Sequence, residues 1–375
     1  MQQYSFSAPG RTEIGGNHTD HQNGCVLAAA VNLAAEAKVV TNKDNVIRVF
    51  SEGFAPVEVA LSDLQVRPGE INTTAALVRG VAAAFAARGT KMEGFDAVVR
   101  SRVLPGSGLS SSASFEVLMG VICNELFCQG KCSAVEIARI GQYAENVYFG
   151  KPSGLMDQMA SSVGGLVFID FADPAKPVVE RLEYDFAASG YALCIIDSGA
   201  DHADLTGEYA AIPGELKALC ALFEKEVLRQ IPEEEFYKAL PDIRHQVPDR
   251  AILRAIHFYN ENKRVLAQVQ ALKSNDLETF FRLMNQSGRS SWMYLQNIAP
   301  AGAVEHQEVA VALALCEALL GGRGACRVHG GGFAGTVQAF VPMEGLDRFR
   351  QQIEKVLGKG ACHVLTVRPE GGKRD

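Results

Sequence analysis

A run of glycines and hydroxyls stands directly before a helical pattern, at Pro105–Ala113 (PGSGLSSSA). Glycines let backbone N–H groups approach a ligand, and the first turn of a helix offers unpaired N–H donors and the positive end of the helix dipole. Such a segment favours an anion such as phosphate, and its serine hydroxyls could hold a magnesium ion. A serine-capped helix after a glycine turn is the other interpretation.

A polar stretch near the N-terminus, Ala8–Gly24, leads into an apolar run. Its groups at Asp20, His18 and His21 can hydrogen-bond a polyol, and Arg11 offers a fixed charge for a phosphate. The H-x-D-H spacing also resembles part of a metallohydrolase site, but the other histidines show no paired metal-ligand spacing. A surface loop without a role is the third interpretation.

A third polar feature is Asp157, in the segment KPSGLMDQM at Lys151–Met159. The segment is a turn bounded by glycine and proline that places an acid beside apolar residues. A half-buried carboxylate can act as a base or as an electrostatic orienter of a hydroxyl. Taken alone, the same aspartate would more often cap a helix.

The standard nucleotide and hydrolase signatures are absent from the sequence. No Gly-Lys pair is followed by Ser or Thr, so there is no Walker A loop. Gly330–Gly335 (GGGFAG) fits G-x-G-x-x-G, but the next residues, Thr336–Val341, alternate like a strand and predict a glycine hairpin. Gly-x-Ser-x-Gly does not occur, which disfavours a serine hydrolase.

Strands and amphipathic helices alternate around these segments, which predicts an α+β (mixed α/β) fold. The expected strands are 95–101, 166–170, 191–197 and 336–341. A helix is expected directly after the serine run, with an apolar stripe at Phe115, Leu118, Met119, Ile122 and Leu126. A second helix opens with a capping box at Ser133 and ends near Gly150, so Glu145 should lie near a helix end.

Composition limits the possible classes of protein. The chain has 375 residues, a net charge of −7 and 47% hydrophobic residues, so a large core is expected and nucleic acid is an unexpected partner. Nine scattered cysteines indicate free thiols in a reducing compartment, and neither a signal peptide nor a membrane span is seen, which favours the cytoplasm. The length suggests two lobes, which we place at 1–180 and 181–375.

Four motifs in this order, PGR with NHTDHQNG, LPGSGLSSSAS, GLMDQMAS and HGGGFAGT, resemble the galactokinase branch of the GHMP small-molecule kinases. GEY at Gly207–Tyr209 is a fifth similar point, and the resemblance is weakest at about 215–298. It implies an N-terminal lobe of ribosomal-protein-S5-like type and a C-terminal ferredoxin-like lobe, with substrates in the cleft between them.

The resemblance also implies roles for individual residues. Asp157 would face the anomeric hydroxyl of a sugar beside Arg11, while Gly330–Gly335 would support the phosphate side. Mg²⁺ would be held by Glu145 and one of the three serines, which we assign as Ser111. The sugar would be bound by Asn17, His18, Asp20 and Tyr209. The ATP phosphates would be wrapped by Gly106, Ser107, Gly108, Leu109, Ser110, Ser111 and Ser112. The expected partners are a sugar and a nucleotide, and the expected state is a monomer or weak homodimer.

The first motif departs from the usual galactokinase pattern, which is close to GRVNLIGEHTDY, because this chain has GRTEIGGNHTDH. Asn17 replaces the usual Glu and His21 the usual Tyr, at sugar-facing positions. Related galacturonate kinases also place a neutral residue there and read D-H-Q next, so a C6 carboxylate would meet no opposing acid. Two carboxylates 4 Å apart repel by about 4 kcal/mol at an effective dielectric near 20. Galacturonate is therefore the second candidate substrate, followed by L-arabinose and N-acetylated sugars.

A non-catalytic sugar sensor built on the same fold is a further alternative, because some galactokinase-like proteins regulate instead of catalysing. The intact Asp157, Arg11 and phosphate segment argue against it. A metallohydrolase is the most distant interpretation.

Overall fold

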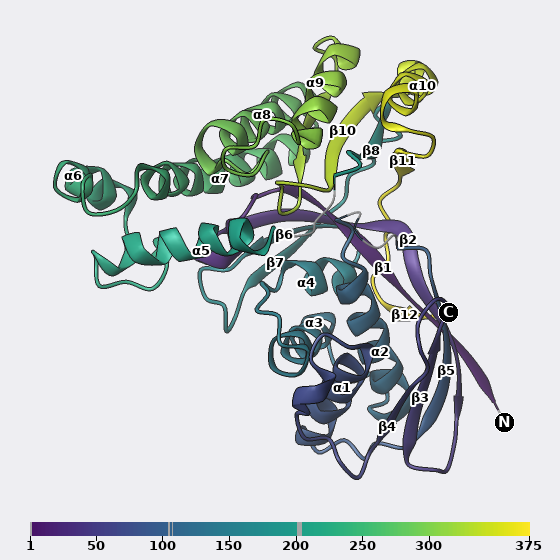
Figure 1. Ribbon diagram of the computed structural model, residues 1–375. Helices are drawn as coiled ribbons and strands as arrows, with labels where there is room; N and C mark the ends of the chain where they lie inside the picture. Colours follow the sequence, from purple (N-terminus) through teal and green to yellow (C-terminus); the bar gives the residue numbers. More distant parts are fainter. Residues whose placement is uncertain (1, 104–105, 107, 201–204) are drawn as a thin grey trace.

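The computed structural model describes residues 2–103, 106, 108–200 and 205–375. Its larger sheet runs through the middle of the molecule (Figure 1). The strand order is β12-β1-β2-β5-β3-β4, and β6 pairs with β2 and β7. Its strands are β1 (Gln3–Gly15), β2 (Cys25–Thr41), β3 (Val46–Ser51), β4 (Val57–Ala60), β5 (Phe95–Ser101), β6 (Leu166–Asp170), β7 (Val178–Leu182) and β12 (Lys373–Arg374).

The long hairpin of β1 and β2 changes its core partners along its length. Phe6 and Ala8 lie in the core with helices of the N-terminal half, whereas Ile14 lies in a core shared with the C-terminal half. Between them the register with β2 shifts, first between Pro9 and Arg11 and again between Glu13 and Gly15. Such irregularities turn a strand and redirect its side chains. The pairing of β1 with β2 is therefore irregular on both sides of Arg11 and Glu13, where β1 passes from the N-terminal core to the core shared with the C-terminal half.

Three helices pack against this sheet, namely α1 (Thr74–Ala87), α2 (Ser111–Phe127) and α4 (Met156–Val163), and α3 (Ala134–Tyr143) packs against all three of these helices. The capping box expected at Ser133 is present, because the Ser133 hydroxyl accepts from the Glu136 N–H while the Glu136 carboxylate accepts from the Ser133 N–H. A π-helical turn, η3 (Ala144–Phe149), continues α3 and ends at Gly150, whose φ of 85° a glycine adopts without strain.

The smaller sheet is antiparallel, in the order β11-β8-β10-β9. Its strands are β8 (Tyr191–Asp197), β9 (Ala325–His329), β10 (Thr336–Pro342) and β11 (Cys362–Leu365), covered by α9 (Glu308–Leu320) and α10 (Leu346–Leu357). In chain order these are the fourth, first, third and second strands of a βαββαβ unit. This is the ferredoxin-like arrangement that the resemblance implied.

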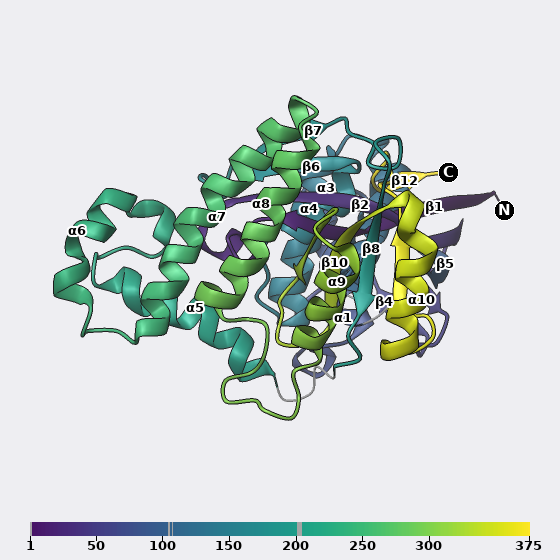
Figure 2. The same ribbon diagram turned by 90° about the horizontal axis from the view of Figure 1, so that it is seen from above.

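The stretch with the weakest motif resemblance is helical. It forms α5 (Thr206–Ala221), α6 (Glu233–Ile243), α7 (Asp249–Lys273) and α8 (Leu277–Ser290), and a π-helical turn, η5 (Ser291–Leu295), follows α8. Seen from above, α7 and α8 lie over the hairpin of β1 and β2 (Figure 2), and Val265 and Phe280 share a core with Leu27. This helical layer brings residues of the second half of the chain to the polar N-terminal motif.

The four expected strands appear at their predicted positions as β5, β6, β8 and β10, and the expected helix after the serine run is α2. The mixed α/β prediction is confirmed. The division at 180/181 stays a prediction: β7 ends at Leu182, and β12, near the C-terminus, pairs with β1 in the larger sheet. Among the described residues, none of the helices combines the length and apolarity needed to cross a membrane.

Candidate active site

An ion pair joins the first and third chemical segments. Arg11 lies on β1 and Asp157 in the first turn of α4, and the Arg11 Nε donates to the Asp157 Oδ1 at 2.6 Å. Burial disfavours the charged guanidinium, but Asp157 outweighs this, so the pKa of Arg11 lies above its usual value. Burial likewise opposes the carboxylate, but Arg11 and the Ser110 hydroxyl hold the pKa of Asp157 below its usual value. Both groups are therefore charged near neutral pH.

The serine segment is attached to this ion pair. The Ser110 hydroxyl donates to Oδ2 of Asp157, and the Arg11 guanidinium donates to the carbonyl of Gly108. The backbone N–H of Arg11 also donates to the Leu109 carbonyl at 3.0 Å. Ser110 is the N-cap of α2 and has a left-handed φ of 55°. Asp157 therefore lies in hydrogen-bond contact with the predicted phosphate segment. The predicted site residue Ser107 lies outside the described residues.

Gly108 has a φ of +70°, and a Cβ built on it would lie 3.0 Å from Nδ1 of His329. The segment thus passes closely over the end of β9, where only glycine fits without displacement. His329 hydrogen-bonds Thr12 at 3.0 Å and Thr336 at 2.9 Å, and burial holds its pKa well below the usual value. This neutral imidazole supports the segment from below.

Glu145 forms a second polar centre beside the start of α2. Its carboxylate accepts hydrogen bonds from Ser153 at 2.6 Å and from Gln158 at 2.8 Å. Ser112 also reaches it, at 3.4 Å. A carboxylate next to a hydroxyl is an oxygen donor set of the kind that Mg²⁺ prefers. No hydrogen bond joins Ser111 to Glu145 in the described part of the chain, so the geometry favours Ser112 over Ser111 as the hydroxyl ligand.

A neighbouring acid, Glu116 on α2, was missed by sequence reasoning. The Gln158 amide donates to Glu116 at 2.9 Å as well as to Glu145. Burial, and then the Glu145 charge, raises the pKa of Glu116 well above its usual value. The Gln158 amide therefore links two carboxyl groups, namely Glu116, which favours its neutral form, and Glu145, which lies near Ser112.

A cavity of about 250 Å³ lies beside Asp157. It is lined by the polar N-terminal motif, by the turn before α4 and by the glycine hairpin after β9. The lining residues are Arg11, Glu13, His18, Asp20, His21, Lys151, Pro152, Ser153, Gly154, Met156, Asp157, Gly330 and Gly331. Polar groups converging on a concave space next to a charged pair are the arrangement expected of a small polar ligand.

His18 lines this cavity, and one of its two ring nitrogens is a buried acceptor. Its Nε2 lies 3.0 Å from the Gly331 carbonyl, which can only accept, so Nε2 carries the proton and Nδ1 is a lone-pair acceptor. Nδ1 is buried and has no hydrogen-bond partner among the described residues. Burial lowers the pKa of His18 to about 4, so the ring is neutral near pH 7. In contrast to Nδ1 of His18, the Oδ1 of Asp20 accepts a hydrogen bond from the His21 backbone N–H at 2.9 Å.

Asn17 does not belong to the described cavity lining, and its side chain is fully buried. Its amide donates to Glu13 at 3.1 Å and to the Gly330 carbonyl at 2.7 Å. Its oxygen accepts from Asn297 at 2.9 Å and from Ser291 at 3.2 Å. A role of Asn17 in direct sugar contact stays a prediction. The structure gives it protein partners on every side.

Tyr209 also lies beside the glycine hairpin rather than among the described cavity residues. Its hydroxyl donates to the Gly332 carbonyl at 2.9 Å, and burial raises the pKa of Tyr209 to about 12. A Cβ on Gly331 would come within 2.7 Å of the ring. Its predicted contact with sugar is likewise untested, and the geometry shows a side chain packed against the hairpin.

Glu13 and Arg327 were both missed by sequence reasoning. Glu13 follows Arg11 by two residues on β1, a spacing that could have flagged a shared face. Arg327, on β9, is fully buried and donates to the Glu13 carboxylate. Burial raises the pKa of Glu13, and Arg327 opposes this effect. No sequence signal links these two residues, because 314 positions separate them.

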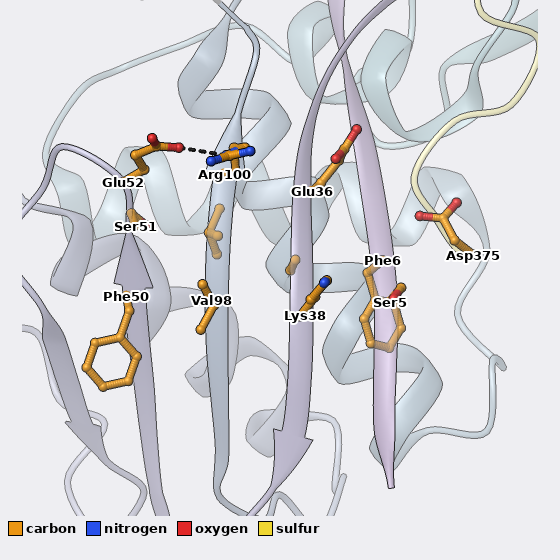
Figure 3. A pocket seen from close by; sticks show the side chains of 12 residues that line it. Ser5, Phe6, Glu36, Lys38, Phe50, Ser51, Glu52, Val98, Arg100 and Asp375 are labelled. Atoms are coloured by element: carbon orange, nitrogen blue, oxygen red, sulfur yellow. Dashed lines mark hydrogen bonds and ion pairs between the residues drawn. The ribbon is translucent and has the colours of Figure 1, made fainter.

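A larger hollow of about 750 Å³ lies away from these residues, on the outer face of the larger sheet (Figure 3). Phe50 and Val98 stand on its floor, and Glu52 pairs with Arg100 at its edge at 2.8 Å. The residues that line it include none of the predicted site residues. It is an uncovered sheet face, not the candidate active site.

The fold and the site define the class of protein. Residues 76–165 match the model of the GHMP kinases N terminal domain, and residues 2–39 match the galactokinase galactose-binding signature. The structure also resembles that of mevalonate kinase, with a TM-score of 0.68 at 15% identity, over 98% of this chain and 99% of that one. The architecture is thus the GHMP kinase fold. No group of three metal-ligating His, Cys, Asp or Glu side chains occurs among the described residues.

Similarity over the full length narrows the family. The galactokinase of Streptomyces coelicolor is 30% identical over 98% of this chain and 93% of its own length. The galactokinase of Glaesserella parasuis is 32% identical over 94% and 88%. The structure of Lactococcus lactis galactokinase complexed with galactose superposes with a TM-score of 0.84 at 24% identity, over 99% of this chain and 95% of that one. The chain belongs to the galactokinase family, and it is a sugar kinase.

Proposed function

We propose that the protein transfers the terminal phosphoryl group of ATP to the anomeric hydroxyl of galactose or a close relative. One observation carries the proposal: Asp157 lines the polar cavity and at the same time accepts a hydrogen bond from Ser110 of the phosphate segment. A sugar in the cavity and a nucleotide at the start of α2 would therefore meet at this carboxylate. The galactokinase relatives support galactose as the first sugar to test.

Asp157 would hold the attacking hydroxyl and receive its proton. Phosphoryl transfer needs alignment and charge neutralisation more than covalent help from the protein. The lowered pKa of Asp157 keeps it ionised, so it accepts a hydrogen bond from the hydroxyl in the ground state. Its weak basicity means that the proton moves only once the forming O–P bond has acidified the hydroxyl. Arg11 fixes the carboxylate and adds positive charge beside the transferred group.

Glu145 and Ser112 would hold Mg²⁺ next to the phosphates, with Ser111 as the alternative hydroxyl. When bound, the metal supplies positive charge that neutralises the phosphate oxygens. Ser153 and Gln158 already orient the Glu145 carboxylate, and Lys151 lies 3.3 Å from it. Unpaired N–H groups in the first turn of α2, together with Gly106 and Gly108, would bind the phosphates.

Galacturonate was the second candidate because a C6 carboxylate was expected to meet no acid near Asn17. The structure argues against that premise, because the Glu13 carboxylate lies 3.1 Å from the Asn17 amide and lines the cavity. The cavity therefore still contains an acid at this wall. Galactose therefore stays the first candidate substrate and galacturonate the second.

A screen for ADP release tests the proposal across galactose, N-acetylgalactosamine, galacturonate and L-arabinose, with phosphorus NMR to locate the phosphate in the product. We expect turnover with galactose and a phosphate on C1. Tight sugar binding without ADP release would favour the sugar sensor instead. Phosphate at any other carbon would refute the assignment of Asp157 to the anomeric hydroxyl.

We also propose a cytoplasmic location and a monomer or weak homodimer. All nine cysteines are free thiols, as expected in a reducing compartment. Size-exclusion chromatography with light scattering checks the second statement, and a stable tetramer would contradict it.

A further inference from the structure

Glu13 is a buried carboxylate at the wall of the candidate sugar cavity, and the proposed function gives it no task. It is 3% exposed and lies on β1 two residues after Arg11. The cavity that contains Asp157 is lined by Glu13 as well. An acid is costly to bury unless it is paired, so its position at this wall calls for a physical reason.

The two oxygens of the Glu13 carboxylate have different surroundings. Oε1 accepts from the Asn17 amide at 3.1 Å and from the buried Arg327 guanidinium. Two donors on one oxygen fit an ionised carboxylate and fix its orientation. Oε2 accepts no hydrogen bond from the described residues. Half of the carboxylate is thus held by the protein, and the other half is left for a ligand.

A second acceptor belongs to His18, a neighbouring residue of the cavity wall. The Nδ1 of His18 is buried, has no hydrogen-bond partner among the described residues and carries a lone pair rather than a proton. His18 and Glu13 both line the cavity. A buried acceptor without a partner, such as Nδ1 of His18, costs stability unless a bound molecule supplies a donor. A ligand with several hydroxyl groups supplies such donors.

We infer that Glu13 determines sugar specificity, because its carboxylate accepts hydrogen bonds from hydroxyls of the bound sugar and favours a neutral sugar over a uronic acid. The inference rests on the proposed function for the identity of the ligand. Compared with the pattern GRVNLIGEHTDY, this chain has exchanged two residue types, with Glu13 at the pattern's Asn and Asn17 at its Glu. The acid is therefore kept but moved four positions, and Arg327 pairs with it there.

The test is calorimetric titration of galactose and of galacturonate into the wild type and Glu13→Gln. Losing a charged acceptor should weaken galactose binding roughly 10–100-fold. The preference for galactose over galacturonate should fall by at least about 10-fold, because the like charge is gone. ATP binding should be unchanged. Glu52→Gln is the matched control, since Glu52 is also paired with an arginine but lies on the outer sheet face (Figure 3).

Glu13→Gln leaves Arg327 without its partner and could fail to fold, so Glu13→Asp is measured beside it. Aspartate keeps the charge for Arg327 but withdraws the carboxylate by one methylene, and galactose binding should again weaken. Wild-type affinity and wild-type preference in the folded variants would overturn the inference. Because binding is read without turnover, a wild type that binds galactose selectively but releases no ADP would refute the proposed function and leave the inference standing.

Discussion

The proposed nucleotide side and the proposed sugar side of the site are built in different ways. On the nucleotide side, Arg11 and Ser110 both contact Asp157, so the motif residues themselves make the contacts. On the sugar side, the motif residues Glu13 and Asn17 are held by Arg327 and Asn297, which come from the C-terminal half. The first region follows the family pattern, and the second departs from it. Sugar recognition is thus where this chain could change without disturbing phosphoryl transfer.

Among the residues that surround Asp157, replacing Arg11 should give the largest effect. Arg11→Gln removes the charge that keeps Asp157 ionised and the donor to Gly108, so kcat should fall by about 100–1000-fold. The pKa of Asp157 should rise, which brings an acid limb into the pH profile. Steady-state kinetics measures both, with the exposed Arg100→Gln as control. A kcat within about threefold of the wild-type value would contradict the proposed role of Arg11 beside Asp157.

Replacing Glu145 tests the same side through the metal. Glu145→Gln should raise the Mg²⁺ concentration needed for half-maximal activity roughly 10–100-fold, because one carboxylate ligand becomes neutral. Mn²⁺ binding followed by electron paramagnetic resonance gives a readout independent of turnover. Sugar affinity should not change. Glu36→Gln, an exposed acid paired with Arg102, is the control. Unaltered metal binding in Glu145→Gln would exclude it as a ligand.

Replacing Asn297 tests the sugar side from a distance. Asn297→Ala removes the donor to Asn17 and the donor at 3.2 Å to the Gly331 carbonyl. The free energy of unfolding should fall by about 1–3 kcal/mol. Sugar binding should weaken a few-fold while ATP binding stays constant. Asn285→Ala, which loses a hydrogen bond to the Cys326 N–H, should cost stability without affecting the sugar. Equal weakening of sugar and ATP would show that the two sides are not separable.

The smallest effect concerns the pH dependence of stability through His18. Its pKa of about 4 in the folded protein lies below that of the unfolded chain, so the unfolded state binds the proton first. This term is absent above about pH 7 and destabilises the protein as the pH falls toward about 4. His18→Asn, which suits the left-handed φ of 57°, should reduce the loss of unfolding free energy between about pH 7 and pH 5. Urea denaturation at both pH values measures it; an unchanged slope would contradict the buried neutral ring.

Local patterns predicted the elements of the site well. The helix after the serine run and the capping box at Ser133 depend on neighbours within a few residues, and both are present. The contact of Arg11 with Asp157 spans 146 positions and followed only from the family resemblance. Sequence reasoning had no signal for the helical layer at 215–298. His257 belongs to this layer, and its Nε2 lies 3.0 Å from the backbone carbonyl oxygen of Asn17. Asn17 was expected at the sugar because the family pattern has a sugar-facing residue at this position, and its protein partners could not be predicted from the sequence.

The central claim is that the sugar and the nucleotide meet at the Asp157 carboxylate. A single-turnover experiment tests it most directly, when the wild type and Asp157→Asn are compared with galactose and ATP both bound. The side chain keeps its shape but loses the charge that holds the hydroxyl. We expect both ligands to bind with near wild-type affinity and formation of sugar 1-phosphate to slow by about 100–10,000-fold. Transfer at close to the wild-type rate would contradict the central place of Asp157.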